Sequence, residues 1–314
     1  MFTAIVTGII LSSISIFVYR YMTQPYVFGP VLRQIEENPV EEGEEDPIYS
    51  SHISNSVIYS ANNDFEISER GNDQVPIKSS RNISAKSYLV INMTDNHVIF
   101  QKNQDTIMPL ASITKLVTAV LARKLINQNK YITITPEMTN AYGNDARFRI
   151  GEKLTAEELL YPLLMLSSND AAEALAISYS GGKKLFMKEM NNWVNSIGAY
   201  QTYFRDPSGM SAQNLSTSKD IAIITKWILE NDPEVFEITK IKSKTIRTHT
   251  WVNPTYFLNL TVYAGGKNGY TSAANRTGVS LFKLGKNEEL FLVILLGSSM
   301  RNNDTLDLLD EAVN

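Results

Sequence analysis

The pattern of apolar and polar positions after residue 86 begins with two short strand-like runs. Residues 87–92 (SYLVIN) and 97–100 (HVIF) lie on either side of the turn-forming residues Thr94-Asp95-Asn96. Two such runs around a polar turn predict a β-hairpin. Strand-like patterning returns near the other end of the chain, over residues 238–247, 258–262, 265–271, 279–284 and 290–296.

Helical periodicity dominates the middle of the chain. Thr155 and Glu158 have the spacing of a capping box, which predicts a helix that runs through Leu166. Thr217 and Asp220 have the same spacing before another periodic run. We therefore predict an α/β (α+β) fold, in which an antiparallel sheet built from both chain ends packs against a mainly helical middle subdomain. The remaining predicted helices cover residues 112–127, 171–177, 182–198, 218–229 and 304–313.

The N-terminal part of the chain has a different pattern. Residues 2–19 (FTAIVTGIILSSISIFVY) form an uncharged apolar run whose length suits one membrane-spanning helix. No basic segment precedes the run and no small-residue cleavage site follows it, so we expect an uncleaved anchor over residues 1–20. Residues 21–85 are acidic and rich in Ser and Asn, which predicts a solvated, disordered linker. The folded domain is then expected over residues 86–314.

Composition excludes several classes of site. The 314 residues include no cysteine, which excludes disulfides, thiol catalysis and zinc–thiolate sites. The three histidines lie far apart in the sequence, so we predict neither a metal site nor a cofactor. Residues 87–314 hold 23 Lys/Arg against 22 Asp/Glu, a net charge of +1. This balance gives no electrostatic reason to expect a nucleic-acid partner.

The first candidate for chemistry is the pair Ser112 and Lys115, at the start of an apolar helical run. A spacing of three residues places both side chains on one helical face, where an amine can accept the proton of a serine nucleophile. The same Ser-x-x-Lys pattern also occurs at Ser180–Lys183 and Ser216–Lys219. The first of these precedes Gly181-Gly182, which is typical of a helix end, and the second precedes a helix cap. We therefore interpret both as structural.

Two further polar clusters follow Ser112 and Lys115 in order: Ser167-Ser168-Asn169 and Lys267-Asn268-Gly269. The triple Ser-x-x-Lys, Ser-x-Asn and Lys-Thr-Gly occurs in penicillin-binding proteins and β-lactamases. Over residues 86–299 the chain thus resembles the serine-type D-alanyl-D-alanine carboxypeptidases, low-molecular-mass penicillin-binding proteins of the β-lactamase/transpeptidase-like superfamily. The resemblance implies a D,D-peptidase that acts on peptidoglycan stem peptides and is inhibited covalently by β-lactams. It also implies that the catalytic domain lies on the extracytoplasmic side of the membrane, where peptidoglycan is found.

The resemblance further implies a role for each residue of the three clusters. Ser112 would attack the D-Ala–D-Ala carbonyl to form an acyl-enzyme, with Lys115 as its general base. Ser167 would relay a proton to the departing amine. The charge of Lys267 would attract the terminal carboxylate and lower the pKa of Lys115 by repulsion. The other substrate-binding residues would be Asn169 for the peptide backbone, Asn268 for the carboxylate, Gly269 for close approach of the strand, and Tyr270, whose N–H would complete an oxyanion hole with that of Ser112.

The chain departs from the family pattern at Asn268, where a threonine or serine is usual. A carboxamide can donate a hydrogen bond to a carboxylate, but it is larger and differently aimed. One alternative is therefore a catalytically weak module that binds or senses the cell wall. The other is a β-lactamase, whose class A form needs Glu-x-x-Leu-Asn; the nearest segment, Glu189–Asn192, lacks the Leu-Asn ending. The sequence leaves open whether a D,D-peptidase here would act as carboxypeptidase, endopeptidase or transpeptidase.

Overall fold

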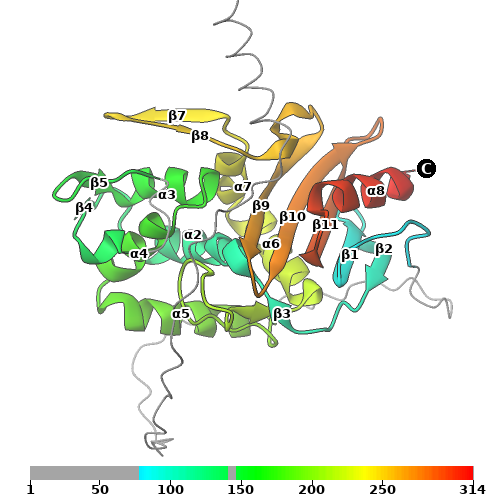
Figure 1. The fold of residues 1–314 in the computed structure, drawn as a ribbon, viewed down its shortest axis with the longest axis horizontal. Helices are drawn as coiled ribbons and strands as arrows, with labels where there is room; N and C mark the ends of the chain where they lie inside the picture. Colours follow the sequence, from blue (N-terminus) through cyan, green and yellow to red (C-terminus); the bar gives the residue numbers. More distant parts are fainter. Residues whose placement is uncertain (1–77, 141–145, 314) are drawn as a thin grey trace, which may run out of the picture. The chain divides into compact units, whose positions relative to one another are not determined.

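The computed structural model describes residues 78–140 and 146–313. The predicted membrane anchor, residues 1–20, and residues 21–77 of the predicted linker lie outside this described part. Within the described part, no helix has both the length and the apolar character needed to cross a bilayer. The described residues form one five-stranded sheet, three two-stranded sheets and the helices that pack around them (Figure 1).

The five-stranded sheet is built from both ends of the domain, as predicted. Its strands are β1 (Ser87–Asn92), β2 (His97–Lys102), β9 (Tyr263–Thr271), β10 (Asn275–Leu284) and β11 (Glu289–Ser298). They lie in the order β2-β1-β11-β10-β9, and every neighbouring pair is antiparallel. The first strand of the domain thus pairs with its last strand, and β9 lies at one edge of the sheet. The predicted hairpin of residues 87–92 and 97–100 is confirmed as the pair β1 and β2.

The two faces of this sheet contribute to two different hydrophobic clusters, because side chains alternate along each strand. On one face, Leu89 and Ile91 of β1 join a core that includes the apolar side of helix α6 (Ser218–Asn231). On the other face, Tyr88 and Val90 join a smaller cluster with helix α8 (Arg301–Val313). Burial of both faces explains why the inner strands are nearly continuous apolar runs.

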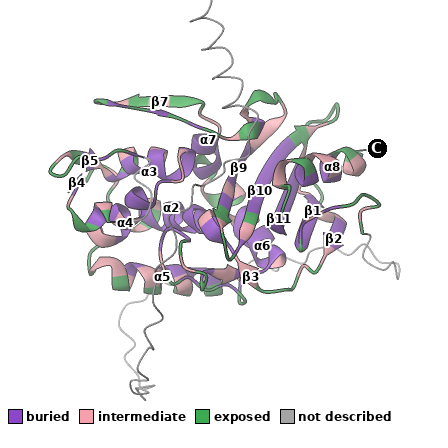
Figure 2. Cartoon of the chain, viewed as in Figure 1, coloured by how far each residue is buried: buried purple, intermediate pink, exposed green. Residues whose placement is uncertain are grey.

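The helical middle is arranged around α2 (Thr114–Leu125), whose residues 114–122 are all buried (Figure 2). The predicted capping box is confirmed, since Thr155 and Glu158 exchange side-chain and backbone hydrogen bonds at the start of α3. Thr217 caps α6 as predicted. The carboxylate of Asp220 accepts hydrogen bonds from the backbone N–H of Gln201 and from the hydroxyl of Thr202. The other helices are α3 (Ala156–Met165), α4 (Asn169–Ser178), α5 (Gly182–Ser196) and α7 (Glu234–Thr239).

Short elements connect these layers. The two-stranded sheets pair β3 with β6, β4 with β5 and β7 with β8. Their bounds are β3 (Met108–Pro109), β4 (Tyr131–Thr133), β5 (Lys153–Thr155), β6 (Leu215–Ser216), β7 (Ser243–Ile246) and β8 (His249–Val252). The 3₁₀ turns are η1 (Ala111–Ile113), η2 (Glu137–Thr139) and η3 (Tyr256–Asn259).

Two of the predicted strands are corrected by the structure: residues 238–247 form a strand only in part, and residues 258–262 form none. In the run 238–247, the first two residues complete α7 and the strand starts only at Ser243. In the run 258–262, the chain first forms the turn η3, where the fully buried Phe257 packs against Phe282. A short apolar run does not fix its own conformation, and here the packing of a buried ring decides it.

The folded domain also includes the last residues assigned to the linker. Ile83 and Ala85 are buried in the cluster beneath α8. The Ser84 hydroxyl and N–H donate to the Asp304 carboxylate at 2.6 and 3.0 Å, and the Arg81 guanidinium donates to Asp307. These residues lack the periodicity of a helix or strand, because side-chain hydrogen bonds to α8 and two apolar anchors hold them instead. The boundary predicted at residue 86 is therefore too late by at least eight residues.

Candidate active site

Ser112 and Lys115 lie where the central helix begins. Ser112 belongs to the 3₁₀ turn η1, and α2 starts two residues later. The spacing of three residues brings Lys115 Nζ to 2.9 Å from Ser112 Oγ, as the sequence predicts. Lys115 is 0% exposed, whereas Ser112 is partly exposed. The hydroxyl is thus reachable from outside while the amine beside it is shielded from water.

Two neutral oxygens hold the Lys115 amine in this position. Nζ donates to Asn169 Oδ1 at 2.7 Å and to the carbonyl oxygen of Ser208. A neutral lysine amine has two N–H groups and one lone pair, so these two acceptors would leave the lone pair directed at the Ser112 hydroxyl. The arrangement suits a general base.

The loop that supplies the Ser208 carbonyl is organised by Asp206. This carboxylate accepts the Ser208 hydroxyl at 2.7 Å and the backbone N–H groups of Ser208, Gly209 and Ser211 at 2.7–2.8 Å. Burial alone would raise the pKa of Asp206, but the hydrogen bonds from the Ser208 side chain and the three backbone N–H groups outweigh it and lower that pKa. An ionised Asp206 therefore fixes the loop against Lys115.

Ser167 lies in the turn between α3 and α4. Its φ is +64°, a conformation that L-residues rarely adopt, and Ser168 next to it caps α4 by accepting the N–H of Ala171. Small polar residues between two helices are usually caps, and here Ser168 alone has that role. The Ser167 hydroxyl instead accepts a hydrogen bond from Lys267 Nζ at 2.9 Å. The second and third clusters of the sequence thus meet.

Lys267 is a buried cation on the edge strand β9, only 5% exposed. Burial is the largest cause that lowers its pKa well below the ordinary value, and the positive charges of Lys115 and Arg301 lower it further. Neither Lys267 nor Arg301 forms an ion pair with a carboxylate among the described residues. Positive charge without a carboxylate partner therefore favours the binding of an anionic ligand at this site.

Gly269 brings the backbone of β9 against the start of the central helix. A Cβ at this position would lie 2.8 Å from the backbone nitrogen of Ser112 and 2.5 Å from Thr277 Oγ1. Only glycine allows this approach to the helix start, while the predicted approach of the strand to the substrate stays a prediction. Tyr270, the next residue, has a side chain that is 61% exposed.

Asn268 lies near Arg301, a residue that the sequence did not point to. It lies opposite Gly278 on β10, and the side chain of Arg301 covers that glycine: a Cβ there would lie 2.9 Å from Arg301 Cδ and 3.7 Å from Asn268 Oδ1. Burial lowers the pKa of Arg301 to about 10, and the charge of Arg276 acts in the same direction. Arg301 Nε has no hydrogen-bond partner among the described residues. Gly278, a glycine inside an apolar strand, is the one sequence signal of such an approach.

The other Ser-x-x-Lys matches have structural roles. Ser180 follows α4 directly before Gly181 and Gly182, both with positive φ. Ser216 bonds to the Thr202 hydroxyl inside the core. Glu189, the first residue of the segment compared with β-lactamases, lies in α5. None of these belongs to the Ser112 site.

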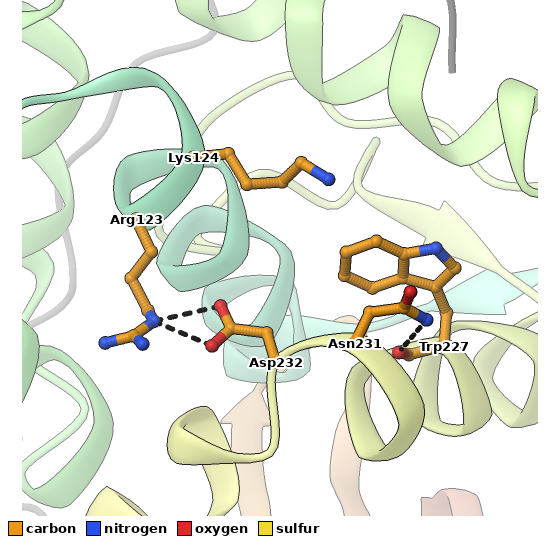
Figure 3. Close-up of a pocket in the computed structure, with 5 residues that line it drawn as sticks. All are labelled: Arg123, Lys124, Trp227, Asn231 and Asp232. Carbon is orange, nitrogen blue, oxygen red and sulfur yellow. Dashed lines mark hydrogen bonds and ion pairs between the residues drawn. The ribbon is translucent and has the colours of Figure 1, made fainter. Parts of the chain in front are cut away.

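A pocket of about 330 Å³ lies elsewhere, where α2 and α6 end (Figure 3). Arg123 Nε donates to both carboxylate oxygens of Asp232 at 2.9 Å, and the Lys124 amine lies 4.5 Å from the centre of the Trp227 ring. Its charged groups already have partners within the pocket, so we assign it no function. The described residues contain no group of three or more acidic or histidine side chains that could hold a metal ion.

Comparison with known proteins agrees with this geometry. A family model described as D-alanyl-D-alanine carboxypeptidase matches residues 74–298. The D-alanyl-D-alanine endopeptidase of Escherichia coli (strain K12) is 33% identical over 214 residues, which cover 62% of this chain and 66% of that protein. The chain spans about half to two thirds of the length of the first curated relatives it matches.

Solved structures share the fold. A D-alanyl-D-alanine carboxypeptidase from Mycobacterium tuberculosis H37Rv superposes with a TM-score of 0.68 at 24% identity, covering 76% of this chain and 96% of that one. The Streptomyces K15 DD-transpeptidase gives a TM-score of 0.69 at 24% identity, covering 74% and 98%. At this identity the likeness concerns the fold, and it confirms the β-lactamase/transpeptidase-like class predicted from the sequence.

Proposed function

This chain belongs to the D-alanyl-D-alanine carboxypeptidase family, and on that premise we propose that it is a serine D,D-peptidase acting on peptidoglycan stem peptides. The observation that carries the proposal is the 2.9 Å contact between Lys115 Nζ and Ser112 Oγ, in a site where the amine is fully buried. Ser112, Lys115 and Ser167 are its proposed catalytic residues.

In the proposed acylation step, Lys115 takes the proton of Ser112 as Oγ attacks the carbonyl of the penultimate D-alanine. The new C–O bond forms a tetrahedral intermediate, whose oxyanion accepts the backbone N–H groups of Ser112 and Tyr270. The close approach of β9 at Gly269 supports this pairing. The C–N bond then breaks and leaves an ester on Ser112.

The departing amine needs a proton, and Ser167 is the proposed donor, with its hydroxyl restored through Lys267 at 2.9 Å. Asn169 would hold the peptide backbone while it anchors Lys115. The terminal carboxylate would lie between Lys267, Asn268 and the guanidinium of Arg301. A water molecule then attacks the ester by the same route in reverse, which releases the shortened peptide and regenerates Ser112.

The test is hydrolysis of a stem pentapeptide by the purified protein, followed by mass spectrometry of the products. We expect release of one D-alanine per peptide, and no release by the Ser112→Ala variant. Rapid, continuous hydrolysis of nitrocefin would instead favour the β-lactamase alternative. A protein that neither cleaves the peptide nor forms a covalent adduct with penicillin would support the weak binding module.

We also propose that residues 2–19 anchor the domain on the extracytoplasmic side of the membrane. The length and apolar character of this run support the proposal, and the substrate lies on that side. Carbonate extraction of the full chain should leave it in the membrane fraction, and replacing residues 1–20 with a cleavable signal should release it. Extraction of the full chain by carbonate would contradict the proposal.

A further inference from the structure

Ala111, the residue directly before the proposed nucleophile, has a strained backbone conformation. Its φ is +49°, in the left-handed region that L-residues rarely adopt, and the residue is only 1% exposed. Strain of this kind persists only where the surrounding structure over-determines the backbone, and it is concentrated at active sites. The groups that contact the backbone around Ala111 therefore impose this conformation.

The first of these groups is the hydroxyl of Thr277 on β10. Its Oγ1 donates to the carbonyl oxygen of Leu110 at 2.8 Å, and Thr277 is 0% exposed. The N–H of Leu110 in turn donates to the carbonyl oxygen of Asn214 at 2.9 Å. Both backbone polar groups of Leu110 are thus fixed, one by the five-stranded sheet and one by the residue before β6, directly ahead of the strained residue.

Two glycines enclose the peptide group that follows, between Ala111 and Ser112. A Cβ at Gly209 would overlap the carbonyl group of Ala111. A Cβ at Gly269 would lie 2.8 Å from the backbone nitrogen of Ser112, which belongs to the same peptide group. Because backbone packs directly against both the carbonyl and the nitrogen, this peptide group has little freedom to rotate.

Thr277 and Gly269 act together at this point. They lie directly opposite each other on β10 and β9, and a Cβ at position 269 would lie 2.5 Å from Thr277 Oγ1. The absence of a side chain at Gly269 therefore leaves the space in which the Thr277 hydroxyl reaches Leu110. The N–H of Ser112 belongs to the enclosed peptide group, and it is one of the two proposed donors of the oxyanion hole.

We propose that Thr277 is a positioning residue for the oxyanion hole, an inference that rests on the proposed D,D-peptidase function. The Thr277 hydroxyl holds the Leu110 carbonyl, and the fixed Leu110 holds Ala111 in its strained conformation. This conformation directs the Ser112 N–H at the oxyanion of the tetrahedral intermediate. Valine at position 277 has nearly the same shape but leaves the Leu110 carbonyl without its donor, so the strained backbone is free to relax.

The experiment measures kcat and KM of Thr277→Val and Thr277→Ser on a D-Ala–D-Ala pentapeptide, with active sites counted by prolonged titration with penicillin. Acylation and deacylation both pass through a tetrahedral oxyanion, so a misdirected donor should lower kcat and leave KM within about twofold. Loss of a whole oxyanion-hole donor costs about a hundredfold to a thousandfold, and for Thr277→Val we expect a loss of about tenfold to a hundredfold in kcat. Thr277→Ser keeps the hydroxyl and should retain kcat within about threefold.

The matched control is Thr225→Val, the same substitution at another fully buried threonine. Thr225 lies in α6, and its hydroxyl has no hydrogen-bond partner among the described residues, so this variant should keep the wild-type kcat. If Thr277→Val yields no active sites, Thr277→Cys replaces it, since a thiol is a weaker donor of similar size and should give a kcat below that of Thr277→Ser.

Three results would overturn the positioning role while wild-type activity still supports the proposed function. They are a kcat for Thr277→Val within about threefold of wild type, an equal loss in Thr277→Ser or Thr225→Val, and a loss confined to KM. Equal kcat values for Thr277→Cys and Thr277→Ser would have the same meaning. If the wild-type protein neither cleaves the peptide nor reacts with penicillin, both proposals are overturned.

Discussion

At the scale of single residues, a fully buried lysine is the costly feature of this site. The Lys115 amine donates to two neutral oxygens, those of Asn169 and of the Ser208 carbonyl. The same design recurs at Lys267, whose amine donates to the Ser167 hydroxyl. Amines held by neutral acceptors are suited to taking and giving protons.

A first prediction concerns Asn268, the departure from the family pattern. If the carboxamide aligns poorly with the substrate carboxylate, then Asn268→Thr should raise kcat/KM on D-Ala–D-Ala peptides. One better hydrogen bond is worth about 1 kcal/mol, which corresponds to roughly a fivefold increase. Steady-state kinetics of the variant and the wild type provide the check. An unchanged or lower kcat/KM would show that Asn268 is not what limits carboxylate recognition.

The sequence predicted contacts between residues correctly where those contacts depend only on local spacing. Ser112 and Lys115 are three residues apart, so helix geometry alone brings them together. Lys267 meets Ser167 across 100 residues, and only the family resemblance made that contact predictable. The sequence did not predict the place of Arg301 near Asn268, because that place depends on how β10 pairs with β9 and on how α8 crosses the sheet.

At the scale of elements, capping motifs predicted the starts of helices correctly, whereas short apolar runs did not predict strands reliably. The capping box at Thr155 forms as its sequence indicates, because all its hydrogen bonds lie within four residues. The run 258–262 could not be assigned from its own residues, since burial of Phe257 against the sheet decides the conformation there. Likewise, strand β7 starts later than predicted, because helix α7 continues through Thr239.

A second prediction concerns the loop that Asp206 organises. Asp206→Asn loses the charge in several hydrogen bonds and should destabilise the domain by about 1.5–3 kcal/mol. It should also slow acylation by penicillin, because the Ser208 carbonyl would no longer hold Lys115 in place. Urea unfolding and acylation kinetics at neutral pH test both effects. Unchanged acylation with reduced stability would contradict the positioning role of the loop.

The pH dependence of this difference follows from the lowered pKa of Asp206. A carboxyl group with a lower pKa in the folded state contributes stability that is present above its unfolded pKa of about 3.9. That contribution is lost as the pH falls through the folded pKa. The stability gap between the wild type and Asp206→Asn should therefore be full at neutral pH and should shrink in acid below about pH 4.

At the scale of the whole molecule, one sheet joins the two ends of the described domain. Strand β1 pairs along its whole length with β11, and residues 78–85 lie against α8. The antiparallel sheet from both ends was predictable because strand-like runs occur at both ends of the domain. The contribution of residues 78–85 was not, since two buried apolar side chains among serines produce no periodic pattern.

A third prediction follows for the start of the domain. A protein that begins at residue 86 loses the buried Ile83 and leaves the buried Asp304 carboxylate without its Ser84 donors. It should be less stable than a protein that begins at residue 78 by about 2–4 kcal/mol. Urea unfolding of the two proteins compares them directly. Equal midpoints would show that residues 78–85 add nothing to stability.

The central claim is that Ser112 is the nucleophile and Lys115 its base, and covalent labelling by benzylpenicillin tests it most directly. After labelling and tryptic digestion, mass spectrometry should place the adduct on Ser112, in the peptide spanning residues 103–115. Ser112→Ala should remove the adduct, and Lys115→Ala should slow its formation at least about a hundredfold. An adduct on Ser180 or Ser216, or undiminished labelling of Ser112→Ala, would contradict the account.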